Sequence, residues 1–360
     1  MRRSLPALLA ASALLFAACG GSGEAETTTT GAPPSSLAAA TTTAATTTSA
    51  PDATTTTTLV PGSPSPLNGL PVDDPDLLDR RVMAVKVDNH WNARPQSGLQ
   101  EADAVVEILV EGGLTRLIAL FHQSDSAYVG PVRSVRPTDS AMLAPLGAPL
   151  VFSGGQDWIQ SLAVTRGISL IGEGTAGLFR MSHRWAPHNL YANTTDARGT
   201  ADERGYDDEF DGPLYAIAAW QEDPPASANS ITLDWGPGHK VTWTYDDGLY
   251  YRAEGTQAHN WVDRAGQGDQ LAFEVLVVIA GRQYVAYPPP GGKSSVPAIE
   301  TLGTGRLLIF AHGKVLEGTW ERDAVDEAFR LFDGEGNPVT VPPGIPWISV
   351  FPQQQPLVWE

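Results

Sequence analysis

The sequence VVEILVEGGLTRLIALF, residues 105–121, decides the fold of the first half of this chain. Its two apolar, partly β-branched runs flank a Gly-Gly pair, and this pattern predicts a β-hairpin. The alternative is one helix over residues 97–111 that ends at the glycine pair. Either structure places Glu107 and Glu111 on the same face, so a shared role for these two carboxylates does not depend on the choice.

The segments around this hairpin alternate between strand and helix patterns. The pattern predicts strands over residues 81–88 and 149–155 and helices over residues 97–103, 134–146 and 157–166. The first of these helices is indicated by a capping-box pattern that begins at Ser97. Strands that alternate with helices predict an α/β domain over residues 67–222.

The character of the chain changes near residue 223, where short strands separated by Gly, Pro and Asp begin. We expect strands over residues 231–235, 240–245, 249–253, 274–280, 306–311, 315–320 and 347–351. Residues 223–360 are therefore a β-rich domain, and the fold class of the whole chain is α+β. This half holds six tryptophans, for which packing in a core is favoured over a platform that stacks on sugar rings: Trp235, Trp243, Trp261, Trp320, Trp347 and Trp359.

The N-terminus has the pattern of an export segment. Arg2 and Arg3 precede an apolar stretch over residues 5–18 that is too short to span a bilayer, so residues 1–18 are predicted to be a signal peptide. Residues 15–19 resemble the lipobox of bacterial lipoproteins, which implies a lipid anchor on Cys19. An ordinary signal peptide and a free buried cysteine are the alternatives. The anchor would place the protein on the extracytoplasmic face of the cell membrane.

Residues 19–66 follow as a segment rich in Thr, Ala, Ser and Pro that has no aromatic residue and no Lys or Arg. Such a segment cannot bury enough apolar surface to fold by itself. We therefore expect a disordered tether that carries the folded part away from the membrane, as a generic spacer rather than a recognition element.

The composition excludes several classes of partner and cofactor. Lys and Arg number 23 against 41 Asp and Glu, and the formal net charge is −18, which disfavours nucleic acid and polybasic docking to lipid headgroups. A single cysteine permits no internal disulfide and no zinc–thiolate cluster. The acidic run over residues 199–212 is interpreted as a solvated loop, since the regular spacing of a calcium loop is absent. We expect no cofactor and no metal.

The arginines of the first half lie beside Gly or Pro in strand ends and loops. Guanidinium groups bind carboxylate or phosphate bidentately, so several that converge would form a pocket for an anion. Structural ion pairs with nearby carboxylates, among them Asp157, are the alternative. The arginines concerned are Arg94, Arg116, Arg133, Arg136, Arg180 and Arg184.

His188 is a candidate general acid or base, because histidine titrates near neutral pH and Glu107 or Glu111 could act beside it. A histidine with a purely structural role is the alternative. The spacing of His183 and His188 across a proline does not match a helical zinc pair. No nucleophile motif is found, and whether the chain is an enzyme stays open.

Several of these segments together resemble the YerB-like bacterial lipoproteins, a family built on domain of unknown function 3048. The matching segments of the first half are Asp88-Asn89, 93–99 (ARPQSGL), 101–103 (EAD), Glu107, 111–116 (EGGLTR), 130–136 (GPVRSVR) and 186–191 (APHNLY). Those of the second half are Tyr251-Arg252, His259, Asp263 and 318–320 (GTW). The resemblance covers nearly all of residues 67–351, and implies an N- and a C-terminal module and membrane-anchored export but no activity.

We expect the polar residues of these segments to gather in one pocket of the first domain. They are Asp88, Asn89, Arg94, Gln96, Glu107, Glu111, Arg116, Arg133, Arg136 and His188, with Asn189 as a further hydroxyl-selecting amide. The favoured function is an envelope lipoprotein that binds an anionic or polyhydroxylated cell-wall ligand. The alternatives are a hydrolase or transferase on such polymers, with Glu107 or Glu111 as base and His188 as acid, or a scaffold for envelope proteins.

Overall fold

The computed structural model describes residues 62–360. The predicted signal peptide, Cys19 and most of the predicted tether lie outside the described residues. The end of that tether is folded, because β1 (Ser63–Pro64) pairs with β2 (Pro71–Val72) and Leu67 is buried in the core. The expectation of disorder up to residue 66 is therefore wrong for residues 63–66. No helix within residues 62–360 is long and apolar enough to cross a membrane.

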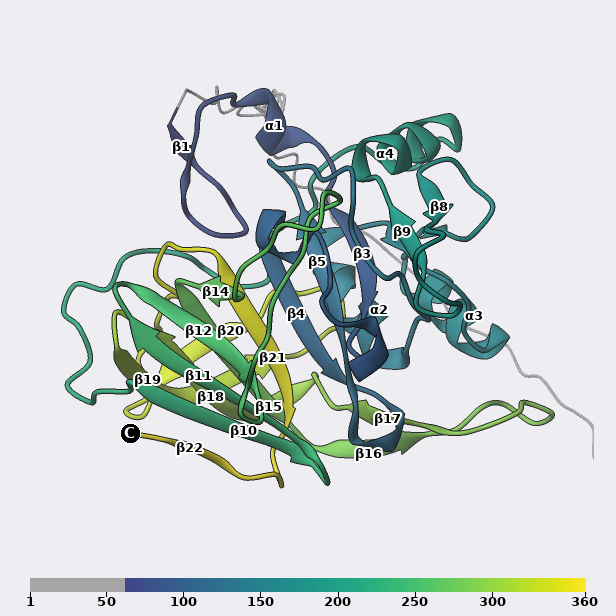
Figure 1. Cartoon of the computed structure of the whole chain (residues 1–360). Helices are drawn as coiled ribbons and strands as arrows, with labels where there is room; N and C mark the ends of the chain where they lie inside the picture. Colours follow the sequence, from purple (N-terminus) through teal and green to yellow (C-terminus); the bar gives the residue numbers. More distant parts are fainter. Residues whose placement is uncertain (1–61) are drawn as a thin grey trace, which may run out of the picture. The chain divides into compact units, whose positions relative to one another are not determined.

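A mixed sheet of ten strands runs through both halves of the chain, in the order β20-β19-β18-β15-β21-β4-β5-β3-β6-β7 (Figure 1). The strands from the first half are β3 (Met83–Asp88), β4 (Ala104–Leu109), β5 (Thr115–Phe121), β6 (Leu150–Val151) and β7 (Leu170–Ile171). Those from the second half are β15 (Val275–Gly281), β18 (Gly303–Ala311), β19 (Lys314–Arg322), β20 (Arg330–Asp333) and β21 (Pro346–Pro352). The halves join where β21 pairs in parallel with β4.

A second sheet belongs entirely to the second half, in the order β13-β12-β11-β10-β22, with β14 paired to β12. Its strands are β10 (Ser230–Gly236), β11 (His239–Asp246), β12 (Leu249–Glu254), β13 (Gln257–Ala258), β14 (Ala272–Phe273) and β22 (Leu357–Trp359). It packs on the ten-stranded sheet through buried aromatic rings, since the centroids of Trp243 and Trp347 are 5.3 Å apart. The predicted α+β class is confirmed.

Within residues 62–360 the helices are few and belong to the first half. They are α1 (Asp76–Asp79), α2 (Pro137–Leu143), α3 (Asp157–Thr165) and α4 (Thr194–Glu203), with single 3-10 turns η1 (Trp91–Ala93), η2 (Leu99–Glu101), η3 (Glu111–Gly113) and η4 (Ala144–Leu146). The described residues also form two small hairpins: β8 (Leu178–Arg180) with β9 (Leu190–Ala192), and β16 (Gln283–Ala286) with β17 (Val296–Ile299).

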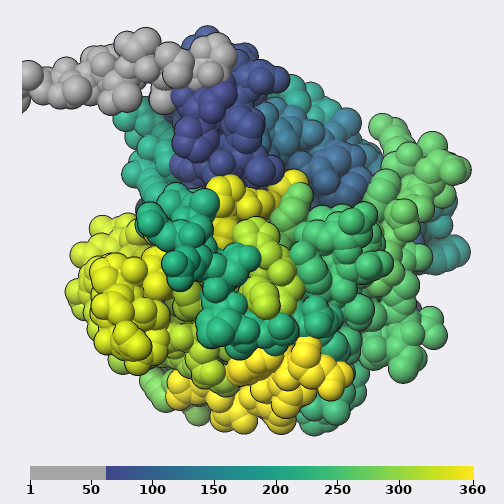
Figure 2. Space-filling view, turned by 90° about the vertical axis from the view of Figure 1, so that its left-hand side faces the viewer, coloured from purple at the N-terminus to yellow at the C-terminus, as the bar shows by residue number. Residues whose placement is uncertain are grey.

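The first described residues contact a late segment of the chain that includes Gly344. Figure 2 shows the first described residues, in purple, against late residues in yellow. The backbone N–H of Gly344 donates to the carbonyl of Asn68 at 2.8 Å, and the Asn68 side chain donates to the carbonyl of Asp103. The segment after the predicted tether is thus hydrogen-bonded to both halves.

The predicted hairpin over residues 105–121 is confirmed. β4 and β5 are antiparallel, with Leu109 opposite Thr115 across the η3 turn, and β4 also pairs with β21 on its other side. The helix alternative over residues 97–111 is wrong, because each apolar run finds strand partners that a helix could not use. All seven strands expected in the second half are present.

Three local predictions need correction. The helix expected from Ser97 is only the 3-10 turn η2, because Gly98 precedes it with φ +82°, and a Cβ there would lie 2.7 Å from Val129. The helix expected from residue 134 begins at Pro137, the position where a missing N–H costs nothing. The acidic run is not all loop, since residues 199–203 belong to α4.

His122, directly after β5, is a buried polar group that the fold keeps uncharged. Its ring is fully buried and stacks on Phe210, with centroids 4.8 Å apart. Neither ring nitrogen has a hydrogen-bond partner among the described residues. Burial lowers the pKa of His122 to about 4. The unfolded chain binds a proton at this group more readily, so the native state loses stability as the pH falls through about 6.5.

Replacing His122 with phenylalanine is expected to remove part of this acid sensitivity. Between about pH 8 and about pH 5 the wild type should lose about 2 kcal/mol of unfolding free energy that the variant keeps. Urea titrations at the two pH values measure the difference. His183→Phe, at an exposed position, should leave the pH dependence unchanged; equal acid sensitivity in His122→Phe and wild type would contradict the assignment.

Candidate functional site

The ten-stranded sheet separates the predicted site residues into two groups, because neighbouring residues of a strand point to opposite faces. Lys86 forms an ion pair with Asp139 of α2, so this face of β3 meets the helices. Glu107 of β4 forms an ion pair with Arg252 of β12, so the opposite face meets the second sheet. In Figure 1 the helices α2 and α3 lie on one side of β3 and β5 and the β10–β12 strands on the other.

A cluster of buried charges occupies the face toward the second sheet. Arg252 donates to Glu107 Oε1 at 2.8 Å and to Glu254 Oε1 at 2.6 Å, and its guanidinium lies 4.8 Å from the ring centroid of Trp347. Glu107 also accepts from the Thr115 hydroxyl at 2.7 Å and from Trp347 Nε1 at 3.0 Å. Glu107 and Arg252 are fully buried, so the two charges neutralise one another away from water.

Amide and imidazole groups close this cluster into a ring of hydrogen bonds. Asn89 Nδ2 donates to the Thr115 hydroxyl at 2.8 Å, and Gln96 Nε2 donates to Asn89 Oδ1 at 2.9 Å. His259 Nε2 lies 2.7 Å from Gln96 Oε1, and His259 Nδ1 contacts the Arg252 guanidinium. We call this set the buried ring: Asn89, Gln96, Glu107, Thr115, Arg252 and His259.

The ring fixes the tautomer of His259. Arginine can only donate, so Nδ1 of His259 must accept and Nε2 carries the proton that it donates to Gln96. Burial, reinforced by the charge of Arg252, holds the pKa of His259 well below its usual value. The imidazole is therefore neutral and serves as a hydrogen-bond relay between the two halves of the chain.

Glu254 connects the buried ring to the surface. Arg94 NH2 lies 2.9 Å from Glu254 Oε1, and His239 Nε2 lies 3.0 Å from Glu254 Oε2. Burial alone would raise the pKa of Glu254, but Arg252, the contact with His239 and the charge of Arg94 together outweigh it, and the pKa falls far below the usual range. Glu254 is thus a permanently ionised carboxylate held between cations.

Glu107, His239 and Glu254 place one ligand atom each within 4.8 Å of one another, as metal ligands would. The donor set does not suit a cation, however, because Arg252 already donates to both carboxylates and Arg94 contacts Glu254. A bound metal ion would have to displace buried guanidinium charge. The three residues are better described as part of an ion-pair network.

Asp88 lies on the face of β3 that meets the helices and contacts two basic residues there. Its Oδ2 lies 2.7 Å from His188 Nδ1 and 3.0 Å from Arg133 Nε, and its side chain is almost fully buried. The imidazole of His90 stacks on that of His188 with centroids 5.0 Å apart. The carboxylate partner of His188 is thus Asp88, while Glu107 and Glu111 have other partners.

The remaining predicted arginines have partners of their own. Arg136 Nε lies 2.7 Å from Glu111 Oε2, and Arg116 NH1 donates to the Ser134 carbonyl at 3.0 Å. Burial lowers the pKa of Arg116 to about 10. Asn189 Oδ1 accepts from Arg180 at 2.6 Å. The predicted residues therefore divide among the buried ring, the Asp88–His188 pair, separate ion pairs, and hydrogen bonds to neutral groups, as for Arg116 and Arg184.

A row of four cavities lies along the loops that surround η1. The first, about 340 Å³, and a neighbour of about 550 Å³ share Trp91, Arg94 and Glu254. The first also shares Pro95 with a cavity of about 400 Å³. That cavity shares His183 and Arg184 with one of about 450 Å³ that Trp185 and His188 line. We call this row the Trp91–Trp185 groove.

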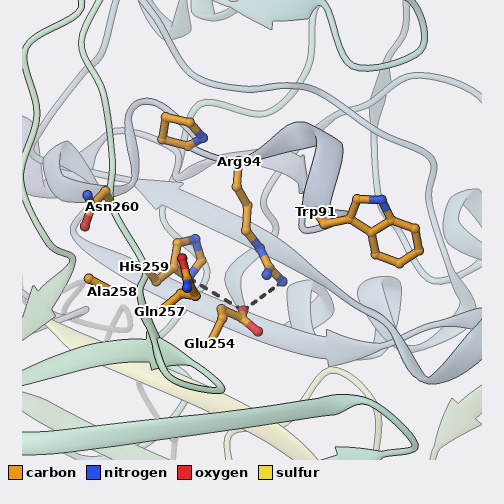
Figure 3. Close-up of a pocket in the computed structure, with 8 residues that line it drawn as sticks. Trp91, Arg94, Glu254, Gln257, Ala258, His259 and Asn260 are labelled. Atoms are coloured by element: carbon orange, nitrogen blue, oxygen red, sulfur yellow. Dashed lines mark ion pairs between the residues drawn. The ribbon is translucent and has the colours of Figure 1, made fainter.

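Figure 3 shows the cavity beside η1. Arg94 and His259 both point toward Glu254, and Trp91 lies beside Arg94, on the side away from His259. The amides of Gln257 and Asn260 line the same cavity. Charged, amide and aromatic side chains thus meet in one recess next to the buried ring.

Sequence reasoning gave no role to Arg252 or Glu254, or to the exposed Trp91 and Trp185. One signal was available in β12, where Tyr250, Arg252 and Glu254 share one face of a half-buried strand. A charged residue at an inward position of such a strand indicates a buried partner. The six tryptophans of the second half are largely core residues, and Trp235, Trp243, Trp320 and Trp347 are almost fully buried.

Comparisons with known proteins agree with the fold and the two modules. The family model described as the N-terminal domain of a protein of unknown function (DUF3048) matches residues 67–207, and that of the DUF3048 C-terminal domain matches residues 231–348. The "Putative lipoprotein YerB" of Bacillus subtilis is 27% identical over 303 residues, which cover 80% of this chain and 86% of YerB. The crystal structure of YerB superposes with a TM-score of 0.69 at 25% identity, and covers 82% of this chain and 99% of that chain. The chain therefore belongs to the DUF3048 family.

Proposed function

We propose that this chain is a lipid-anchored protein of the cell envelope, held at the extracytoplasmic face of the membrane through Cys19. The sequence around Cys19 and the name of the YerB relative support the anchor. We further propose that the Trp91–Trp185 groove binds a polyhydroxylated cell-wall polymer. The groove takes the place of the single pocket expected from the sequence.

The observation that carries the proposal is the exposure of two tryptophans along a polar groove. Trp91 is 64% exposed and Trp185 is 89% exposed, and both line cavities of the row. Indole rings left in water are costly, and rings beside hydrogen-bonding groups are typical of surfaces that bind an amphipathic ligand. The faces of sugar rings are such partners, while hydroxyls suit the amides of Asn92, Gln257 and Asn260.

Two of the predicted ligand-binding residues and one catalytic candidate lie at or beside this groove. Arg94 lines two of the cavities and His188 lines another, with Asp88 in direct contact with His188. Arg116, Arg133 and Arg136 line none of the four cavities, and Asn89, Gln96 and Glu107 support the groove from the buried ring. The ligand contacts we propose are therefore Trp91, Arg94 and Trp185.

The double variant Trp91→Ala/Trp185→Ala is expected to bind purified wall polysaccharide about 10-fold to 100-fold more weakly, because each lost aromatic contact is worth about 1 kcal/mol or more. Co-sedimentation with fractionated wall material and titration of intrinsic fluorescence measure the affinity. Tyr287→Ala removes another exposed aromatic, 74% exposed on the β16–β17 hairpin, and should leave binding unchanged.

The same experiment decides between the alternatives. Equal loss in Tyr287→Ala, or no binding by wild type, would refute the groove and leave a scaffold for envelope proteins. Mass spectrometry of the supernatant tests the hydrolase alternative, for which the Asp88–His188 pair beside the groove is the candidate acid/base. Released fragments that disappear in His188→Ala, with binding retained, would establish turnover.

A further inference from the structure

Most arginines of the described chain are neutralised by a carboxylate within 4.0 Å. These are Arg80, Arg81, Arg94, Arg133, Arg136, Arg180, Arg198, Arg252, Arg282, Arg306 and Arg330. Six of the 17 arginines within residues 62–360 have no such partner: Arg116, Arg166, Arg184, Arg204, Arg264 and Arg322. Two of the unpaired ones, Arg184 and Arg264, line the same cavity of about 400 Å³.

Arg184 is held rigidly by neutral oxygens. It donates to the carbonyls of Ala93 and Pro95 at 2.9 and 3.0 Å and to the Tyr191 hydroxyl at 3.0 Å. These bonds use three of the five N–H groups of a guanidinium, and none of them neutralises its charge. Within residues 62–360, the other N–H groups of Arg184 have no partner, so they remain for a ligand.

Arg264 approaches from the second half of the chain. Its guanidinium lies 5.9 Å from the ring centroid of Tyr128 and 5.5 Å from that of Phe179. No hydrogen bond joins it to any other part of the described chain. Tyr128 stacks on Tyr191 at 4.3 Å, so the aromatic stack that supports Arg264 also contacts Arg184. The two guanidinium groups thus line the same cavity and contact one aromatic stack.

Asp263 is the carboxylate that lines this cavity, and it is committed to its own loop. Its Oδ1 accepts from the backbone N–H groups of Ala265 and Gln267, at 2.9 and 2.8 Å. It forms no ion pair with Arg184 or Arg264, since no such pair lies within 4.0 Å. The cavity therefore keeps an excess of positive charge in a protein that is strongly acidic as a whole.

We propose that Arg184 and Arg264 form a subsite for an oxyanion, a phosphate or a carboxylate carried by the ligand of the Trp91–Trp185 groove. This inference rests on the proposed function, because the subsite shares Pro95, His183 and Arg184 with the rest of the groove. Paired guanidinium groups bind such oxyanions with charge-assisted hydrogen bonds. The subsite gives the groove a preference for anionic over neutral polymers.

The test compares three polymers on the full-length protein: poly(glycerol phosphate), polygalacturonate and dextran. Wild type is expected to bind at least one of the two anionic polymers more tightly than dextran, with an affinity that falls as salt is added. Arg264→Gln should weaken that binding about 10-fold and leave dextran binding unchanged. The matched control is Arg204→Gln, an exposed arginine without a carboxylate partner that donates to the Leu170 carbonyl elsewhere.

A second readout keeps the subsite testable without any polymer. Inorganic pyrophosphate should shift the side-chain NMR signals of isotope-labelled Arg184 and Arg264 and spare that of Arg204. If Arg264→Gln keeps the preference for anionic polymers and the NMR signals do not shift, the subsite is overturned. Binding of dextran would in that case still uphold the groove. Shifted signals without binding of any polymer would uphold the subsite and overturn the proposed function. A preference for phosphodiester or for carboxylate polymer identifies the source of the anion.

Discussion

Replacing Arg252 with methionine is expected to lower the free energy of unfolding by about 3–5 kcal/mol, because Glu107 then stays buried without its cation. The guanidinium donates to Glu107 at 2.8 Å and to Glu254 at 2.6 Å, and Arg252 and Glu107 are both fully buried. Methionine keeps much of the volume against Trp347, so the lost charge is the main change. Chemical denaturation followed by tryptophan fluorescence measures the loss.

The chain offers a closely matched control in Arg306. It lies 2.8 Å from Glu317 and 5.4 Å from the ring centroid of Trp359, so its partners are of the same kind as those of Arg252. The side chains of Arg306 and Glu317 are 42% and 52% exposed, however. Water replaces the lost partner there, and Arg306→Met should cost less than about 1 kcal/mol. Equal losses in the two variants would show that the buried ring adds no stability.

The buried ring also bears on ligand binding, although Arg252 lines none of the four cavities of the groove. Its partners Glu254 and His259 form the floor of the cavity beside Trp91 (Figure 3). Arg94 is oriented by Glu254 and by Asn89, whose Oδ1 accepts from Arg94 Nε at 3.0 Å. A groove built from both halves of the chain thus depends on a hydrogen-bonded ring that joins them.

The sequence was informative where a pattern is local. The Gly-Gly pair between two β-branched runs predicted the β4–β5 hairpin. The Gly, Pro and Asp residues that separate short apolar runs predicted the strands of the second half. The motifs also pointed to Asn89, Arg94, Gln96 and Glu107, which do come together. Their partners come from the second half of the chain: Glu107 binds Arg252, 145 positions away, Arg94 and Asn89 contact Glu254, and Gln96 contacts His259. No periodicity connects residues so far apart, so the ring could not be predicted.

The sheet divides the predicted residues between its two faces, and the motifs did not reveal this for a different reason. Asp88 and Asn89 are neighbours in sequence, and a motif presents them as one unit. At the end of a strand they point to opposite faces, so Asp88 meets His188 and Asn89 meets Thr115. Once the hairpin was preferred over the helix, this alternation could have been applied to the motif. The groove depends on loop geometry around Trp91 and Trp185, which no pattern encodes.

Replacing Lys86 with methionine is the second variant with a large expected effect. Lys86 Nζ lies 2.7 Å from Asp139 Oδ1, and both side chains are fully buried between β3 and α2. Removing the ammonium leaves Asp139 with the backbone N–H of Arg136, at 2.7 Å, as its remaining donor. We expect a loss of about 3–5 kcal/mol in unfolding free energy near neutral pH. Lys240→Met, at an exposed pair with Asp234, is the matched control and should change little.

The pH dependence separates the charge of Lys86 from its packing. Burial lowers the pKa of Lys86 from 10.5 to about 8. Between these values the unfolded chain binds more protons at this group than the native protein, so its contribution makes stability rise with pH. Wild type should gain about 1–2 kcal/mol between about pH 8 and about pH 9.5 relative to Lys86→Met.

A double variant, Lys86→Met/Asp139→Asn, completes the argument. The amide that replaces the Asp139 carboxylate is neutral and can still accept from the Arg136 N–H, so no buried charge remains without a partner. The double variant should therefore recover most of the stability lost in Lys86→Met. If it were as unstable as the single variant, the loss would come from packing at the β3–α2 contact, and the buried pair would not explain it. Recovery together with a flat alkaline profile would assign the effect to charge.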